Sequence, residues 1–365
     1  MDLSFLRPLY ARPGPFACAY LDVSEDGGRS RSGPAGWEQV RERLVAEGAD
    51  VATVGALAHA VSPGDGPIAT SPGLAVFAAH GRLALAESLH ERPEHDRATV
   101  TFVPDAMPLA LQHAPDIAFA AVQVRRVQEP GGASQLVAEV QIGRWPAARV
   151  TPPEPHMRQA AAGEWRQEAV ALAAELTAAE DRHGIELVVL SGDRWGCSVL
   201  RAALPGRLDE RVVGLDIEPR AVGAGGLLFE EELGYLFDGR LSARDKHHVE
   251  RFLTERARQG EAVEGLTATA GALREGAVAV LLVDTPQDLD RERLWVGAAT
   301  RQLGVSQEVL APLQAEASWQ VPAGAAVLRA LVGEGGELVA VPREELPLAD
   351  GVGALLRERP RERAA

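Results

Sequence analysis

Two spacings of hydrophobic residues alternate along the 365-residue chain and predict an alternation of strands and helices. Short apolar runs such as "IELVVLSGD" at 185–193 have the length and composition of buried strands. Longer stretches with apolar residues three or four positions apart are typical of helices with one buried face. Strands are predicted at 16–24, 73–89 (a hairpin turning at His80-Gly81), 118–124, 135–142, 185–193, 277–284 and 337–341, and helices at 36–50, 161–184, 227–239, 242–260, 263–276, 323–332 and 350–358.

The stretch 161–184 gives the clearest helix signal. Trp165, Ala169, Leu172 and Leu176 recur along one face of it, which is the pattern of a helix packed on a core. Gly184 follows, and glycine is the residue that most often ends a helix in left-handed backbone. We expect Trp165, like Trp195 further along the chain, to be a core residue.

The segment 144–159, "RWPAARVTPPEPHMRQ", lies before this helix and breaks both patterns. Its four prolines favour extended, non-helical backbone, so we expect a stiff loop. Its positive side chains are Arg144, Arg149, His156 and Arg158, against a single glutamate. The arginines are either solvated in an ordinary surface connection or preordered to bind phosphates. Composition does not separate these two interpretations.

The order of the elements predicts an α/β protein of three domains, at residues 1–115, 116–220 and 221–365. A proline-containing stretch at 104–116 is the predicted linker between the first two. In the middle domain, a strand hairpin is followed by a helix, a strand, a further helix and a last strand. This alternation is typical of a layered α/β domain.

The charge balance limits the partners that this chain can have. Lysine and arginine number 37 against 52 aspartates and glutamates, a net charge of −15. A surface of this sign does not suit non-specific coating of nucleic acid, so DNA is not an expected partner. No run approaches the roughly 20 apolar residues that span a bilayer, and the first residues lack a signal-peptide pattern. We therefore expect a cytoplasmic protein without a membrane partner.

Familiar site motifs are missing from the sequence. It contains no P-loop, no dinucleotide fingerprint and no nucleophile elbow. Cys18 and Cys197 lie far apart, and we expect two reduced thiols packed as small hydrophobic groups. The glycine turn at 191–198 could hold an anion at a helix start, although it is more often simply the way out of a strand. Neither a metal nor a cofactor is expected.

Three strings of residues together resemble a known superfamily. They are "IELVVLSGD" followed by a helix, the stretch 251–283 that begins "RFLTERARQGEAVEG", and the ending "DGVGALLR" at 350–357. In this order they resemble the archaeal and eukaryotic class-one peptide chain release factors and Pelota, and most closely the bacterial branch of that superfamily. The resemblance covers roughly residues 118–358. It implies a three-domain release-factor-like architecture with an RNase H-like middle domain and a third domain related to kink-turn-binding ribosomal proteins.

The resemblance also implies a position for the segment 144–159. In the release factors, the loop before the long middle-domain helix carries Gly-Gly-Gln and enters the peptidyl-transferase centre. This chain contains no Gly-Gly-Gln, and without any asparagine it cannot contain the Asn-Ile-Lys-Ser stop-codon signature. The nearest glutamines, Gln159 and Gln167, do not follow a glycine. Stop-codon decoding is therefore not expected.

Three functions stay open at this point. The first is a ribosome-binding factor that occupies the A site in hibernation, stress or rescue without catalysis, with Arg144, Arg149, His156 and Arg158 on ribosomal RNA. Another is a peptidyl-tRNA hydrolase similar to the Vms/ANKZF-type enzymes, with Gln159 or Gln167 positioning a water. The third is a binding protein of this fold that acts off the ribosome. The resemblance implies ribosomal RNA, tRNA and a translational GTPase as partners.

Another basic stretch, 240–251, lies in the predicted third domain. Arg244 and Lys246 are the residues for which we predict an RNA contact, within a domain that is otherwise acidic. A solvated helix face explains the same pattern equally well.

Overall fold

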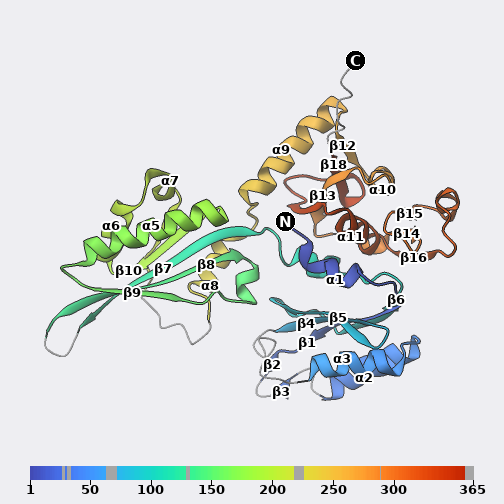
Figure 1. Ribbon diagram of the computed structural model, residues 1–365, viewed down its shortest axis with the longest axis horizontal. Helices are drawn as coiled ribbons and strands as arrows, with labels where there is room; N and C mark the ends of the chain where they lie inside the picture. The colour runs from blue at the N-terminus through green and yellow to red at the C-terminus, as the bar shows by residue number, and fades with distance from the viewer. Residues whose placement is uncertain are drawn as a thin grey trace. The chain divides into compact units, whose positions relative to one another are not determined.

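The computed structural model describes residues 1–26, 29–30, 34–62, 72–128, 132–217, 226–287 and 289–357. The chain packs as two compact units, which are Met1–Ala114 together with Arg244–Ala365, and Pro115–Ala243. We call them the split unit and the central unit. Both contain sheets flanked by helices (Figure 1), so the predicted α/β class is confirmed. The division into three domains stays a prediction.

The N-terminal part of the split unit is a four-stranded antiparallel sheet. Its strand order is β5 (Arg82–Leu89), β4 (Gly73–Ala79), β1 (Phe16–Asp22) and β6 (Arg97–Thr101). Successive side chains of β1 point to opposite faces, and both faces are buried. Ala17, Ala19 and Leu21 share one core with α2 (Pro34–Ala46) and α3 (Val51–Val61). The predicted hairpin is confirmed, with His80 and Gly81 at its turn in left-handed backbone.

The C-terminal part of the split unit contains two further sheets. The larger has the order β12 (Ala262–Glu264), β18 (Val352–Leu356), β13 (Val278–Thr285) and β17 (Glu337–Pro342). Strands β13 and β17 are parallel, and the chain between them includes α11 (Ala323–Glu334). The smaller sheet has the order β15 (Leu303–Gly304), β14 (Arg293–Val296) and β16 (Trp319–Pro322). The remaining α-helices here are α9 (Ala243–Arg258) and α10 (Leu266–Arg274).

One hydrophobic core joins the two ends of the chain within the split unit. It contains Phe16 and Phe77 from the first sheet and Val327 and Leu338 from the C-terminal part. The short helices α1 (Arg7–Tyr10) and α4 (Met107–Leu111) contribute to the same core. The predicted linker at 104–116 is not loose, because Met107, Leu109 and Ala110 are fully buried, although the boundary between the two units falls within it, after Ala114.

The predicted closing helix at 350–358 is also wrong within the described residues, where β18 lies between β12 and β13. Its five residues form a short apolar run, and such a run does not distinguish a strand from a buried helix by periodicity. A Cβ atom added to Gly353 would lie 2.8 Å from the Phe252 ring, which shows how closely α9 packs on this strand. The sheet therefore decides the conformation.

The central unit is built on one five-stranded sheet. Its order is β11 (Val212–Leu215), β10 (Leu187–Gly192), β7 (Ile117–Gln128), β8 (Ser134–Trp145) and β9 (His156–Ala161). The first three strands are parallel, and β7, β8 and β9 are antiparallel. The Pro-Gly-Gly sequence at 130–132, a turn signal between the predicted strands at 118–124 and 135–142, lies mostly outside the described residues.

Helices cover both faces of the central sheet. On one face, α5 (Trp165–His183) and α6 (Arg194–Ala203) share a core with alternate residues of β7, β8 and β10. On the other face, α8 (Glu230–Phe237) packs with Phe119 and Trp145. The prediction for α5 is confirmed in detail, since all four expected residues are buried and Gly184 ends the helix at φ +67°.

The expected loop at 144–159 is a different structure. Residues 147–149 form a short 3-10 turn, and His156–Ala161 is the edge strand β9, paired with β8. The four prolines all precede β9, where they do not interrupt its hydrogen bonds. Pairing with β8 therefore makes the end of this segment a strand, which its proline content does not predict.

Among the described residues, every helix is too short or too polar to span a bilayer.

Candidate nucleic-acid interface

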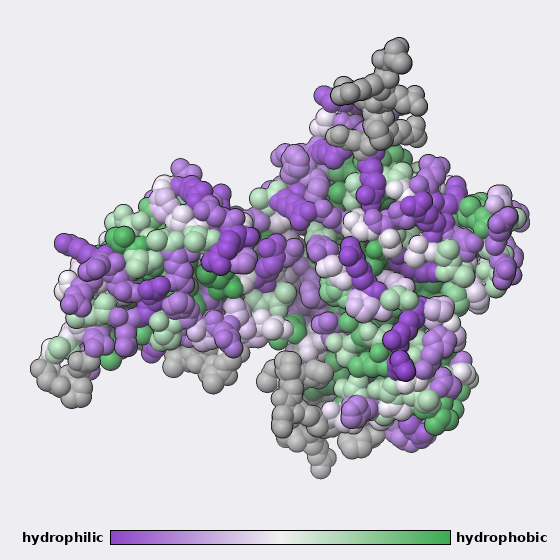
Figure 2. Space-filling view, in the orientation of Figure 1, coloured by the Kyte–Doolittle hydropathy of each residue, from purple (hydrophilic) through white to green (hydrophobic). Residues whose placement is uncertain are grey.

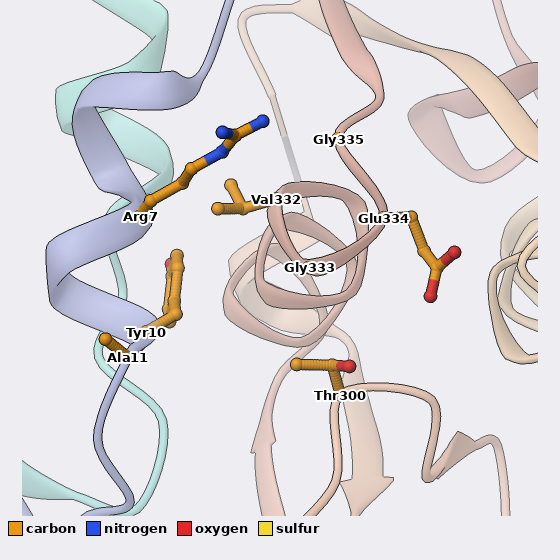
Figure 3. A pocket seen from close by; sticks show the side chains of 8 residues that line it. All are labelled: Arg7, Tyr10, Ala11, Thr300, Val332, Gly333, Glu334 and Gly335. Atoms are coloured by element: carbon orange, nitrogen blue, oxygen red, sulfur yellow. The ribbon is translucent and has the colours of Figure 1, made fainter.

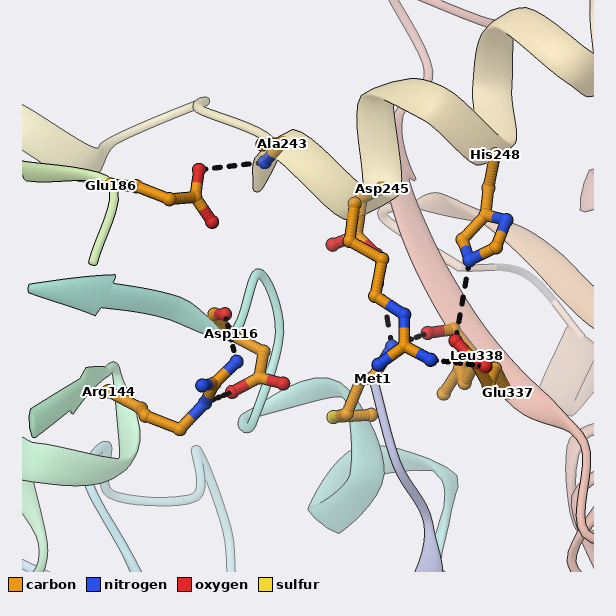
Figure 4. Close-up of polar contacts among 10 residues, drawn as sticks. Met1, Asp116, Arg144, Glu186, Ala243, Asp245, His248, Glu337 and Leu338 are labelled. Carbon is orange, nitrogen blue, oxygen red and sulfur yellow. Dashed lines mark hydrogen bonds and ion pairs between the residues drawn. The ribbon is translucent and has the colours of Figure 1, made fainter. Parts of the chain in front are cut away.

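The arginines of the segment 144–159 are paired with carboxylates inside the central unit. Arg144, at the end of β8, bonds to both the side chain and the backbone carbonyl of Asp116 (Figure 4). Arg149 lies 3.4 Å from Glu230 and stacks over the Trp145 ring at 5.5 Å. The local excess of positive charge in the sequence is therefore compensated in three dimensions.

Arg158 is the most tightly held of these cations. It bonds from β9 to two carboxylates of α5, Glu168 at 2.9 Å and Glu175 at 2.8 Å. Hydrogen bonds to Glu168 and then Glu175 raise the pKa of Arg158. His156, on the same face of β9, lies 3.3 Å from Glu175. This cluster ties the edge strand to the long helix, and RNA binding by these four residues stays a prediction.

Gln159 and Gln167 lie on opposite sides of the sheet. Arg158 points to α5, and neighbouring strand residues point to opposite faces, so Gln159 projects away from that helix. Gln167 is the third residue of α5. Both are exposed. Since the sheet separates them, the two amides cannot hold one water between them.

The basic stretch 240–251 is compensated in part. Arg244 and His248, on α9, both contact Glu337. The contact of His248 spans 3.3 Å (Figure 4). Burial lowers the pKa of His248 against the opposing effect of Glu337. Lys246 is exposed and has no carboxylate partner within the described ranges. Of the two cations predicted to bind RNA here, Lys246 is the less constrained.

The glycine turn at 191–198 is an ordinary exit from a strand. Asp193 caps α6 by accepting a hydrogen bond from the Gly196 amide at 2.7 Å. Burial pushes the pKa of Asp193 up, but hydrogen bonds from Arg126 and from the Gly196 amide lower it overall. The carboxylate therefore occupies the place that an anion would take at this helix start.

Trp195 differs from the prediction made for it. It is 41% exposed, whereas Trp165 is fully buried. Arg126 of β7 lies over the Trp195 ring, 5.6 Å from its centroid, and donates to both oxygens of Asp193. On the face drawn in Figure 2, hydrophobic residues of the central unit show as small green patches among hydrophilic ones. The helical spacing around position 195 does not reveal this exposure, because the sequence does not show what packs against the first turn of α6.

Cys18 and Cys197 are both free thiols, Cys18 buried and Cys197 half-buried. Burial raises the pKa of both thiols, that of Cys197 to about 11, so both are protonated at neutral pH. No group of three metal-ligating side chains occurs in the part of the chain that the structure describes.

A pocket of about 360 Å³ lies beside the end of α11 in the split unit (Figure 3). Arg7 and Tyr10 line one side of it, and Thr300 and the residues Val332–Gly335 line the other. The Glu334 carboxylate points away from Arg7 and binds Arg301 at 2.5 Å. No acid–base pair faces this pocket among its lining residues.

Comparison with known proteins gives a family match over most of the central unit and α9. The model of bacterial archaeo-eukaryotic release factor family 2 matches residues 119–258. Two relatives from Mycobacterium tuberculosis are each 28% identical over 374 residues, covering 96% of both sequences. They are the uncharacterized proteins Rv2629 (strain ATCC 25618 / H37Rv) and MT2704 (strain CDC 1551 / Oshkosh).

Solved structures of release-factor relatives are similar only at a distance. Archaeoglobus fulgidus Pelota is 15% identical, with a TM-score of 0.36 over 78% of this chain and 80% of that one. Saccharomyces cerevisiae Dom34 is 9% identical, with a TM-score of 0.34 over 79% and 81%. The family model over residues 119–258 confirms the resemblance of this part of the chain to the bacterial archaeo-eukaryotic release factors.

Proposed function

We propose that this protein is a cytoplasmic translation factor that binds the ribosome at the A site and does not catalyse peptide release. The family match over residues 119–258 supports the link to translation. The positions of Gln159 and Gln167 support the absence of catalysis. Hydrolysis of peptidyl-tRNA needs a water held within hydrogen-bond reach of the ester, on backbone that can approach it closely.

The position of each glutamine in regular secondary structure is the observation that supports the non-catalytic half of the proposal. Gln159 is fixed in an edge strand opposite Val137, and Gln167 lies in the first turn of a helix. Tandem glycines would let backbone approach a substrate because they lack Cβ atoms, and neither glutamine is beside one. Regular secondary structure at both positions does not offer that access.

Two assays test the two halves of the proposal. Purified protein should co-sediment with ribosomes through a sucrose cushion, and stalled ribosome–nascent-chain complexes should not release their peptide when it is added. The same sedimentation with a translational GTPase tests whether such a partner joins, as the family resemblance implies. Co-sedimentation that fails under growth and under stress conditions would place the protein off the ribosome.

The hydrolase alternative has a direct test in the same release assay. Gln159→Ala and Gln167→Ala each remove one amide and leave the backbone pairing intact. We expect no change in either variant. Release well above background, abolished by either substitution, would establish a peptidyl-tRNA hydrolase similar to the Vms/ANKZF-type enzymes.

A further inference from the structure

The start of α6 presents an exposed indole on a rigid turn. Gly192 has φ +111°, and a Cβ atom at this position would lie 1.9 Å from the Val124 carbonyl oxygen. The Asp193 amide donates to that same oxygen at 2.7 Å. The turn therefore lies directly on β7, and the first turn of α6 cannot shift without breaking these contacts. Trp195 is held in place before any partner arrives, which lowers the ordering cost of binding.

The two arginines next to Trp195, Arg126 and Arg194, each have a carboxylate partner, but only Arg126 is held tightly. Arg126 is fixed against the ring by its two hydrogen bonds to Asp193, at 2.8 and 3.1 Å. Arg194, the residue before Trp195, is 89% exposed, and its ion pair with Asp216 spans 3.5 Å. An ion pair between two such exposed side chains contributes little and exchanges partners readily.

We propose that Trp195 is a stacking platform for an unpaired base of RNA, with Arg194 available to the adjoining phosphate. The proposal rests on the proposed function, because it names RNA as what this end of the central unit meets on the ribosome. Stacking suits an aromatic face in a charge-compensated setting, since every base has a π face. Tracking of the phosphate backbone would need an uncompensated basic groove instead.

The surroundings favour RNA over a protein partner. A stable protein interface buries about 800 Å² per partner around an apolar centre. The exposed large hydrophobic side chains of the central unit are instead distributed over different elements: Val127 on β7, Met157 on β9, Val170 on α5, Trp195 on α6 and Tyr235 on α8. A single exposed ring with Arg126 over it and Arg194 next to it in the sequence matches one base and its phosphate better than it matches a protein surface.

The test uses the full-length protein and a short, unstructured, labelled single-stranded RNA. Binding is followed by anisotropy of the RNA label, and stacking by quenching of tryptophan fluorescence. We expect Trp195→Ala to weaken binding about 5- to 100-fold. Trp195→Phe should retain most of the affinity and lose the quenching, because an aromatic face remains without the indole. Val170→Ala, another exposed apolar side chain, is the matched control and should change neither signal.

Duplex RNA of the same sequence should bind more weakly, and added salt should have a small effect on single-strand binding. The proposal is overturned if Trp195→Ala matches Val170→Ala in both readouts. It is also overturned if Trp195→Ala weakens ribosome sedimentation while RNA affinity stays unchanged, since the partner would then be a ribosomal protein. Failure of the proposed function is distinct: the wild-type protein would bind RNA through Trp195 and yet not sediment with ribosomes.

Discussion

The basic segment 144–159 and the turn at 191–198 differ in what their sequences reveal about the surface. The positive charge of the first is visible in the sequence, whereas the exposed aromatic surface of the second is not. The basic segment is rich in arginine, and the structure pairs those arginines with carboxylates that come from distant parts of the central unit. The turn has the sequence of an ordinary exit from a strand, and the structure leaves Trp195 exposed beside Arg194. Positive charge counted along a sequence therefore does not locate a positive surface. Exposure, which depends on packing, decides which side chains are available to a partner.

Two tryptophans of the central unit, Trp165 and Trp195, show this contrast most sharply. Trp165 is fully buried and donates from its indole nitrogen to the Gly196 carbonyl at 3.0 Å. Trp165→Ala should lower the free energy of unfolding by about 3 to 5 kcal/mol, because it leaves a cavity and an unpaired carbonyl. Trp195→Ala should lower it by less than about 1 kcal/mol, since its side chain is 41% exposed. Chemical denaturation of both variants measures the difference, and equal losses would contradict the contrast.

Arg158 and Arg194 allow a half-buried ion pair to be compared with an exposed one. Arg158→Gln would leave Glu168 and Glu175, which lie on one face of α5, without the guanidinium that they share, and should cost about 1 to 2 kcal/mol of stability. Arg194→Gln should have no measurable effect on stability, because both members of its ion pair are about nine-tenths exposed. Denaturant midpoints with an unchanged slope would report the difference. A loss of stability in Arg194→Gln as large as in Arg158→Gln would show that exposure does not separate the two pairs.

His248 extends the comparison to a group whose charge is suppressed by burial. Its folded pKa is lowered, so the unfolded chain binds the proton more readily than the folded one. The stability of the split unit should therefore fall as pH decreases below about 6.5, the ordinary value for histidine. This loss of stability should be smaller than the losses expected for Trp165→Ala and Arg158→Gln. The dependence on pH should be weaker in His248→Gln. Thermal unfolding of both proteins at about pH 7.5 and about pH 5.5 measures it.

Lys246 and Arg244 give the smallest expected effect. Lys246→Gln should reduce ribosome sedimentation by about twofold if this exposed cation contacts a phosphate, and the loss should disappear at high salt. Arg244→Gln should act mainly on stability, because Arg244 is engaged with Glu337. Identical ribosome binding by Lys246→Gln and wild type over a range of salt would remove Lys246 from the predicted interface.

The sequence by itself determined the long helix α5, the hairpin of β4 and β5, the paired strands β7 and β8 and the α/β class. In each case a regular hydrophobic period or a turn residue acts locally, and tertiary contacts agree with it. Only the tertiary structure decided that residues 352–356 form a strand and that 107–111 belong to the core, since short apolar segments take the conformation of the sheet or core that receives them. It likewise decided that the arginines of 144–159 are compensated and that Trp195 is exposed. Pairing with Asp116, Glu175 or Glu230 depends on which distant residues the fold brings within a few ångströms, and no local pattern of hydrophobic and polar residues contains that information.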